Sequence, residues 1–280
     1  MKCYLCDSTD LNKVAGKVRD KPEIDILKCN ECSLVFLDYE TSIEYYRNDY
    51  TEFNHANDTW RSCLRGAHED DLRRSGIIKT MAKDKVYCDV GCGAGGLLQM
   101  VQPFCRQVIG VEPQTKWHLD LVSEGFTIAN SIDEIEDDYF DVISLFHVLE
   151  HIADPIAFLI SLKRKLRKGG TLVVEVPNAD DALLTVYKSK PFSHFTYWSP
   201  HLYLFSQNTL SVTLIKAGFT DHIIKQFQRY PLANHLMWLA NGIPGGHETW
   251  SFLNSPDLAI SYEKVLAQIN KCDTLFSYAN

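Results

Sequence analysis

Long apolar segments are missing from this chain of 280 residues. No run reaches the roughly 18 apolar residues that a membrane-spanning helix needs. The first residues, MKCYLCDSTD, contain no apolar segment of the kind that a secretory signal requires. Internal repeats and low-complexity segments are absent as well. We therefore expect a globular, cytoplasmic protein without membrane contact.

Positive charge is also scarce, because the formal net charge is -8 and the isoelectric point is near 5.7. Proteins that bind polyanions neutralise phosphates with lysine and arginine. The densest basic stretch, KRKLRKGG at 163–170, lies at the C-terminus of a predicted helix, where cations complement the helix dipole. We therefore expect a small-molecule partner and no nucleic acid.

The chain has nine cysteines, and in a reducing compartment they are expected as thiols. Cys3, Cys6, Cys29 and Cys32 form two CxxC pairs, which together supply the tetrahedral sulfur ligands of structural zinc. Four protein ligands leave no open position for catalysis. The alternatives are four unrelated cysteines or a redox pair, but neither pair opens a helix as a redox motif would. The other cysteines lack paired spacing and are expected to be buried or inert: Cys63, Cys88, Cys92, Cys105 and Cys272.

Strand and helix patterns alternate from residue 85 onward. Apolar runs such as KVYCDV, QVIGVEP, FDVISLF and TLVVEVP are separated by amphipathic segments such as PIAFLISLKRKLRK. This alternation is typical of a doubly wound α/β domain, in which helices cover both faces of a parallel sheet. The predicted organisation is a zinc ribbon (1–38), a helical connector covering the ligand edge (39–84), the α/β domain (85–228) and a C-terminal helical or lid extension (229–280).

A strand, a glycine turn and a helix follow one another in VYCDVGCGAGG, 86–96. Glycines let the backbone approach a ligand closely, and a carboxylate ending the second strand, here Glu112, can bind both hydroxyls of a ribose. The same glycines satisfy the dinucleotide pattern GxGxxG, so an NAD-dependent enzyme is an alternative. Asp89 favours another ligand, because its carboxylate would repel a pyrophosphate and attract an ammonium group. S-adenosylmethionine carries such an ammonium.

With these residues the chain resembles the class I S-adenosylmethionine-dependent methyltransferases, whose first motif is an acidic residue followed by GxGxG. The resemblance continues in order through FDVISLFHVLEHIADP, LRKGGTLVVEVPN and HLYLFSQNTLSVTLIKAGF, covering about 85–220. It implies a Rossmann-like fold. The alternative, an NAD-dependent enzyme, would need a catalytic domain for which the remaining chain has hardly any room. The cofactor residues that the resemblance implies are Asp89, Gly91, Cys92 and Gly93 at the methionine end, Glu112 and Pro113 at the ribose, Ser131 and Ile132 near the adenine, and Phe146 and His147 beneath the cofactor. A helix cap for Asp89 and a solvated strand end for Glu112 are the structural alternatives.

The segment HVLEHI lies at the ligand edge, ahead of a helix that we expect to begin at Asp154 and Pro155. If this turn is helical, one of its sides carries the side chains of His147, Glu150 and His151. Two imidazoles and a carboxylate arranged in this way could bind a divalent cation. Similar Glu-His pairs bind metal in small-RNA terminal and catechol-type O-methyltransferases, which carry an acidic residue where this chain has a histidine. A general-base or positioning role, or a purely structural helix start, are the alternatives.

The segment from 177 to 206 is too long and aromatic for a simple turn, and such loops at a ligand edge are usually functional. His194, Tyr197 and His201 offer protons or ligands there, and lid packing is the alternative. In related sequences, the position of His201 lies in an element that approaches the cofactor pocket. The candidate catalytic residues are His147, His151, His194 and His201.

A CxxC ribbon joined to this domain resembles bacterial methyltransferases of sugar and surface-polysaccharide pathways. Some of these carry an additional C-terminal domain for C-methylation, for which this chain has no room. We therefore expect O-methylation of a sugar, a nucleotide-sugar or a related small polar acceptor, in a surface-polysaccharide or secondary-metabolite pathway. The alternatives are a metal-dependent O-methyltransferase acting on an RNA end or a catechol-type diol, and a non-catalytic assembly module.

Overall fold

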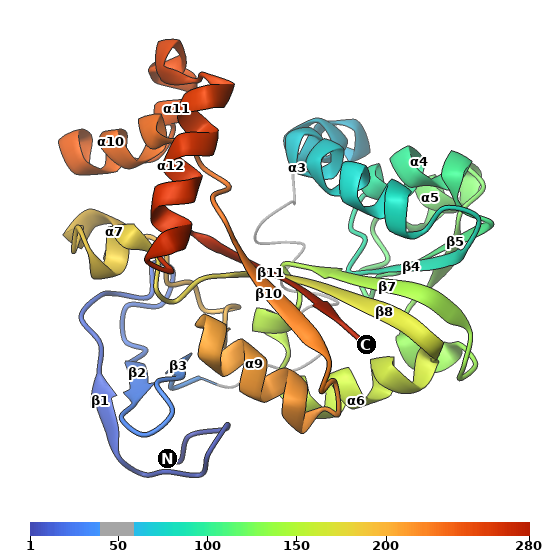
Figure 1. Cartoon of the computed structure of the whole chain (residues 1–280), viewed down its shortest axis with the longest axis horizontal. Coiled ribbons are helices and arrows are strands. Elements are labelled where there is room, and N and C mark those ends of the chain that lie inside the picture. Colours follow the sequence, from blue (N-terminus) through green and yellow to red (C-terminus); the bar gives the residue numbers. More distant parts are fainter. Residues whose placement is uncertain (40–58) are drawn as a thin grey trace.

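The computed structural model describes residues 1–39 and 59–280, which contain a seven-stranded and a four-stranded sheet (Figure 1). The larger sheet runs in the order β10 (His222–Phe227), β11 (Thr274–Ala279), β8 (Leu166–Pro177), β7 (Phe140–Phe146), β4 (Val86–Val90), β5 (Gln107–Val111) and β6 (Thr127–Ala129). The smaller sheet runs in the order β1 (Leu11–Lys13), β2 (Ile26–Cys29), β3 (Val35–Leu37) and β9 (Tyr203–Leu204).

Helices cover both faces of the larger sheet (Figure 1). One face carries α3 (Trp60–Met81), α4 (Gly96–Val101) and α5 (His118–Ser123), and the other carries α6 (Pro155–Lys165) and α9 (Gln207–Lys216). Successive strand residues point to opposite faces, so Val173 packs in the hydrophobic cluster on the α4 side and Val174 in the cluster on the α6 side. The strands β6, β5, β4, β7 and β8 are parallel. The predicted doubly wound α/β fold is confirmed.

The C-terminal segment of the chain completes this sheet. Strand β11 pairs antiparallel with both β8 and β10, so Phe276 lies opposite Glu175 on one side and Lys225 on the other. The structure thus places residues 274–279 inside the sheet, although the sequence predicts an extension over 229–280. A short apolar run such as TLFSYA is ambiguous by pattern alone, and it is separated from β10 by a long insertion.

The insertion between β10 and β11 is a helical arm, defined here as residues 228–273. It contains α10 (Leu232–Asn241), α11 (Gly246–Thr249), the 3₁₀ turn η4 (Ser251–Leu253) and α12 (Pro256–Gln268). The arm projects beyond the edge of the sheet (Figure 1). Of the helices in the described part of the chain, none has the length and apolar character that crossing a membrane would require.

The ribbon and the α/β domain share a sheet. Strand β9 comes from the 177–206 loop and pairs with β3 of the ribbon, with Phe36 opposite Tyr203. Asp20 of the ribbon accepts hydrogen bonds from the backbone N–H and the hydroxyl of Ser199, at 3.0 and 2.6 Å. The same loop also contains the short helices α7 (Ala182–Thr185) and α8 (Lys190–Ser193). The ribbon therefore supports this loop directly.

Helix α3 extends over much of the predicted connector, of which residues 40–58 lie outside the described residues. Thr59 caps its first turn in a reciprocal capping box with Ser62, which fixes the start of the helix. The indole N–H of Trp60 donates to the carbonyl oxygen of Ala94 at 2.8 Å. Helix α3 is thereby held against the glycine turn that follows β4.

Candidate active site

A cavity of about 950 Å³ opens at the carboxyl ends of β4, β5, β6 and β7. This is where ligands bind in doubly wound sheets, and the volume suits a small-molecule site. Every residue predicted to contact the cofactor lines it: Asp89, Gly91, Cys92, Gly93, Glu112, Pro113, Ser131, Ile132, Phe146 and His147. Helix α3 contributes a further wall, which includes Cys63, Asp70, Asp71 and Arg74.

The turn after β4 needs glycine for steric reasons. Gly91 has a φ of +77°, and a Cβ at this position would lie 2.4 Å from Cγ2 of Val148. Asp89, directly ahead of the turn, is buried and accepts a hydrogen bond from the Ser144 hydroxyl at 2.7 Å. Burial raises the pKa of Asp89 to about 7, against the effect of Ser144. Asp89 caps no helix, because the N-cap of α4 is Gly95 and no side chain caps this helix.

Glu112, at the end of β5, is buried and is not a solvated strand end. Its two carboxylate oxygens accept backbone hydrogen bonds, one from Gly93 and one from Gln114, both at 2.9 Å. Burial raises the pKa of Glu112, while these two N–H groups oppose the rise. Each oxygen keeps further acceptor capacity, which is what a pair of ribose hydroxyls requires.

Beyond Glu112 the cavity becomes apolar. Ile132 and Trp117 are nearly buried side chains in its lining. Ser131 begins the 3₁₀ turn η2 (Ile132–Glu134), and its hydroxyl accepts from the backbone N–H of Asp133 at 3.2 Å. The apolar side chains of Ile132 and Trp117 suit contact with an aromatic base.

His147 lies between two buried carboxylates in the lining of the cavity. Its Nδ1 is 3.1 Å from Oε1 of Glu150, and its Nε2 is 3.1 Å from Oε1 of Glu175, the second contact being an ion pair without hydrogen-bond alignment. Burial lowers the pKa of His147, but the two carboxylates outweigh it and raise the pKa overall. Both ring nitrogens of His147 lie against carboxylates, and the raised pKa favours the protonated ring, so this geometry disfavours the predicted role of His147 as a base.

The predicted metal-binding group differs from the group that the structure assembles. The sequence grouped His147 with Glu150 and His151, whereas the structure brings Glu150, His151 and His201 together, with potential ligand atoms within 4.8 Å of one another. His147 is instead engaged by Glu175. His201 takes its place because the 177–206 loop folds back over the 3₁₀ turn η3 (Leu149–His151), and the His151 and His201 rings meet edge to face at 4.8 Å.

The charge states of this cluster differ from residue to residue. Burial lowers the pKa values of His151 and His201, that of His201 to about 3, so both imidazoles are neutral at neutral pH. Burial opposes ionisation of Glu150, but His147 and the other two histidines outweigh it and lower its pKa to about 2. Oε2 of Glu150 is buried and has no hydrogen-bond partner among residues 1–39 and 59–280.

His194 does not line this cavity. It ends helix α8, where the carbonyl oxygen of Ser193 accepts from the backbone N–H of Lys17 at 3.2 Å. Tyr197 is buried in the cluster that the ribbon forms with this loop. Lid packing therefore describes Tyr197, because this part of the 177–206 loop packs on the ribbon, while Trp198 and His201 reach the cavity and His194 stays outside its lining.

A charge network beneath the cavity was missed by the sequence reasoning. Glu175 on β8 is fully buried and accepts from both terminal nitrogens of Arg73 at 2.9 Å and from Nη2 of Arg74 at 2.8 Å. Arg73 also donates to Asp70 of the same helix. Asp70 accepts a second hydrogen bond, at 3.0 Å, from Nε of Arg229 at the base of the helical arm. In the sequence, the acidic and basic pairs of DDLRR are typical of a solvated helix face, and no local signal marks their distant partners.

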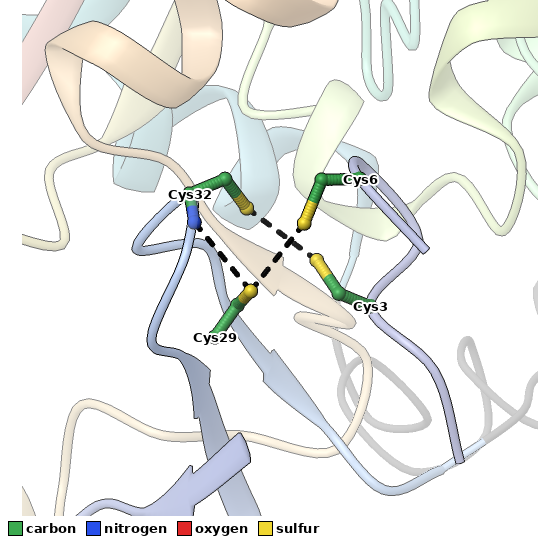
Figure 2. A group of neighbouring side chains, drawn as sticks. All are labelled: Cys3, Cys6, Cys29 and Cys32. Carbon is green, nitrogen blue, oxygen red and sulfur yellow. Dashed lines mark hydrogen bonds between the residues drawn. The ribbon is translucent and has the colours of Figure 1, made fainter. Parts of the chain in front are cut away.

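The ribbon cysteines converge as predicted (Figure 2). Sγ of Cys3 lies 3.4 Å from Sγ of Cys32, and Sγ of Cys6 lies 3.5 Å from Sγ of Cys29. Burial opposes ionisation of Cys29, but the backbone N–H of Cys32 and the Cys6 thiol lower its pKa to about 7. Four thiol groups thus surround one point, which is the donor set that structural zinc prefers.

Residues 68–223 match the model of a family described as a methyltransferase domain, and this match spans more than half of the chain. The chain belongs to this methyltransferase family. Its cavity at the carboxyl edge of the sheet and the acidic residue ahead of the glycine turn agree with S-adenosylmethionine as the cofactor of the domain.

Curated relatives include a tRNA U34 carboxymethyltransferase from Alteromonas mediterranea, 31% identical over 156 residues, which are 50% of this chain and 46% of the relative. A ubiquinone biosynthesis O-methyltransferase from Cereibacter sphaeroides is 29% identical over 99 residues, or 32% of this chain and 40% of the relative. The matched region thus spans about half or less of these relatives.

Two solved structures share the fold. A SAM-dependent methyltransferase from Archaeoglobus fulgidus aligns with a TM-score of 0.52 and 18% identity, over 84% of this chain and 99% of that one. A chain from the complex between the Haloferax volcanii Trm112 methyltransferase activator and a methyltransferase aligns with a TM-score of 0.55 and 14% identity, over 84% and 96%. At this identity the alignments show the fold alone, and that fold is the class I methyltransferase fold.

The comparisons correct one expectation about partners. The exclusion of nucleic acid is wrong, since the family includes relatives named for tRNA U34. Net charge averages over the whole surface, so a negative total does not exclude a local site for RNA. The relatives named above also give no support to the expected sugar acceptor or to the resemblance to sugar methyltransferases.

Proposed function

We propose that this protein transfers the methyl group of S-adenosylmethionine to a hydroxyl oxygen of an acceptor bound beside His151 and His201. The observation that carries this proposal is one continuous cavity, with Asp89 and Glu112 at one end and neutral imidazoles with Trp198 at the other. Methyl transfer is an in-line displacement, so the enzyme supplies alignment and removes the proton of the hydroxyl.

His151 is the better proton acceptor of the two histidines. Both are unprotonated at neutral pH because burial lowers their pKa values, but the value of about 3 makes His201 a weak base. In the proposed reaction the acceptor oxygen attacks the methyl carbon as its proton passes to His151. His201 orients the acceptor, and the methionine sulfur leaves as the thioether of S-adenosylhomocysteine.

A metal-assisted form of the same reaction is the second candidate. The unpartnered Oε2 of Glu150 and the two neutral imidazoles beside it form a two-histidine, one-carboxylate donor set. A divalent cation held by Glu150, His151 and His201 would act as a Lewis acid on the hydroxyls of a diol. We expect calorimetry with Mn²⁺ to give one site, lost in Glu150→Gln and in His201→Ala but kept in His194→Ala; absence of binding to the wild type would eliminate this candidate.

The ribbon is proposed to hold a structural zinc ion. Around zinc with bonds of about 2.3 Å, tetrahedral sulfurs lie about 3.8 Å apart. The sulfur separations of 3.4 and 3.5 Å come close to this value, so the four side chains need to move little. Because all four ligands come from the protein, this zinc would have no open position for a substrate.

The donor site is tested by calorimetry with S-adenosylhomocysteine. Asp89→Ala and Glu112→Ala should abolish binding while the circular dichroism spectrum stays unchanged, and His194→Ala, outside the cavity, should bind as the wild type does. Unchanged affinity in the first two variants would remove the assignment.

The transferred atom is tested with S-adenosylmethionine that carries a trideuterated methyl group, incubated with separate RNA and metabolite extracts. Mass spectrometry should find the label on an oxygen atom of one product, and His151→Ala should abolish this labelling. Label on carbon or nitrogen would contradict O-methylation.

A further inference from the structure

A second cavity, of about 620 Å³, lies between the ribbon and the 177–206 loop. Its lining includes Val14, Lys28 and Val35 from the ribbon, and Leu184, Lys188 and Tyr197 from the loop. No residue in the described part of the chain lines both this cavity, here named the ribbon pocket, and the cavity of the proposed active site. Small molecules bind in cavities of this size. The ribbon pocket is therefore a candidate for a second binding site.

Backbone contacts hold the two walls of the ribbon pocket together. The N–H of Lys17 donates to the carbonyl oxygen of Ser193 at 3.2 Å. The N–H of Arg19 donates to the carbonyl oxygen of Tyr197 at 2.9 Å. Between these two bonds, Gly16 approaches Tyr197 so closely that a Cβ on Gly16 would lie 2.7 Å from Cε2 of the ring. The protein itself thus sets the spacing of the walls, and the ribbon pocket exists before a ligand binds.

Polar side chains without partners gather in the lining of the ribbon pocket. Four lining residues have side chains with no hydrogen-bond or ion-pair partner within residues 1–39 and 59–280: Lys28, Ser33, Lys188 and Asn208. Each of these side chains can donate hydrogen bonds. Asp180 is the acidic residue of the described lining, and its Oδ1 lies 3.6 Å from Nζ of Lys271. Two uncompensated positive charges therefore border the ribbon pocket, one on each wall.

This combination of charges and donors fits a phosphate monoester. Such a group carries about 1.5 to 2 negative charges at neutral pH and has three strong acceptor oxygens. The ammonium groups of Lys28 and Lys188 match that charge, whereas a carboxylate would compensate only one of them. Apolar side chains also line the pocket, with Val35 and Leu184 on opposite walls. The rest of the ligand therefore has an apolar surface to contact.

We propose that the ribbon pocket binds an organic phosphate monoester, with the phosphate at Lys28 and Lys188 and the apolar part between Val35 and Leu184. The site shares no lining residue with the cavity of the proposed active site in the described part of the chain. The inference therefore goes beyond the proposed function and does not rest on it.

Occupation of the ribbon pocket restrains the loop close to the acceptor end. Tyr197 lines the ribbon pocket, and the next residue, Trp198, lines the cavity of the proposed active site. A ligand that contacts both the ribbon and the loop adds a link between them, so it stabilises the loop against local opening.

The experiment is calorimetry with phenyl phosphate, in the presence of excess S-adenosylhomocysteine so that the donor site is filled. Phenyl phosphate should bind the wild type at one site. Phenol lacks the phosphate, inorganic phosphate lacks the apolar part and benzoate has a single charge, so each should bind at least about tenfold more weakly.

Three variants locate the bound phenyl phosphate. Exposed ion pairs are individually weak, so Lys28→Met and Lys188→Met should each reduce the affinity about three- to fivefold, and the double variant about tenfold or more. Ala15→Trp should abolish binding, because Ala15 is an exposed residue of the lining and the larger side chain would fill the pocket. Lys190→Met is the matched control, because Lys190 belongs to the same loop but lies outside the lining, and it should bind as the wild type does.

Hydrogen exchange gives a second readout, in which phenyl phosphate should slow the exchange of peptides that cover 184–197 in the wild type and not in the double variant. No binding to the wild type at about 10 mM phenyl phosphate, equal binding of benzoate, or equal weakening by Lys190→Met would overturn the inference. Binding that survives in both the double variant and Ala15→Trp would overturn it too, because phenyl phosphate would then occupy another place. Both lysines are exposed, so the double variant keeps the fold and decides the matter even if Ala15→Trp does not fold.

Discussion

Replacement of Asp20 by alanine should loosen the acceptor end of the cavity and leave the donor end intact. Asp20 belongs to the ribbon, and its carboxylate accepts from both the backbone N–H and the hydroxyl of Ser199. Ser199 is fully buried and lies between Trp198 and His201, which line the cavity. The variant removes both acceptors at once.

The size of the effect follows from these two donors. A buried donor that loses its partner costs about 1–3 kcal/mol, and water can partly replace the side chain of Asp20 because Asp20 is itself only half-buried. We therefore expect a loss of about 2–4 kcal/mol in the local stability of residues 197–204. Since about 1.4 kcal/mol corresponds to a factor of ten, opening should become about 30- to 700-fold more frequent.

Hydrogen exchange read by mass spectrometry measures this opening directly. Peptides that cover 197–204 should exchange faster in Asp20→Ala, while the dissociation constant of S-adenosylhomocysteine stays within about threefold of the wild type. Asp25→Ala is the control, because Asp25 pairs with Lys13 on the surface of the same ribbon, with side chains 44% and 72% exposed. Such a surface pair contributes about 0–1 kcal/mol. An increase below about threefold in Asp20→Ala, or an equal increase in Asp25→Ala, would refute the link between the ribbon and the acceptor end.

Other properties follow from buried charges and the ribbon. Because burial raises the pKa of Asp89 to about 7, the carboxylate is protonated below that pH in the ligand-free protein, so affinity for S-adenosylhomocysteine should fall by up to about tenfold per unit below pH 7. Calorimetry across about pH 6 to 8 tests this, and a flat profile would contradict it. Cys29→Ser should release zinc, as metal analysis of the purified protein would show; wild-type protein that is metal-free and equally stable would argue against the zinc site. His147→Gln should lower the free energy of unfolding by about 3–5 kcal/mol, because the buried Glu150 loses its partner, whereas Glu175 keeps Arg73 and Arg74. A decrease below about 1 kcal/mol in denaturant titration would disprove this role.

The donor end of the cavity could be predicted from the sequence because its residues are set by local geometry. Asp89 and Gly91 follow one buried strand, and Glu112 ends the next. The carboxyl ends of neighbouring parallel strands meet at one sheet edge, so a short motif on each strand is enough to place the cavity. The two CxxC pairs are equally local, and their convergence needs only that the strands between them pair.

The acceptor end could not be predicted in the same way, because its residues come from distant segments. His201 reaches Glu150 only through the fold of the 177–206 loop onto the ribbon. Arg73 and Glu175 are 102 positions apart, and Arg73 has the appearance of a solvated helix residue in the sequence. His147 seemed to belong with Glu150 and His151 by helical spacing, but its φ of +57° departs from a helix. Long-range contacts of this kind leave no periodic pattern in a single sequence.

The two ends of the helical arm are direct neighbours. Phe227, the last residue of β10, lies opposite Thr274, the first residue of β11, in antiparallel register. Opposed residues in such a ladder have Cα atoms about 5 Å apart, a gap that a two-residue hairpin turn can close. The register of the flanking strands therefore does not depend on the length of residues 228–273, although Arg229 at the base of this segment also binds Asp70 in the cavity wall. A shortened arm that keeps Arg229 would preserve both the sheet and this wall of the cavity.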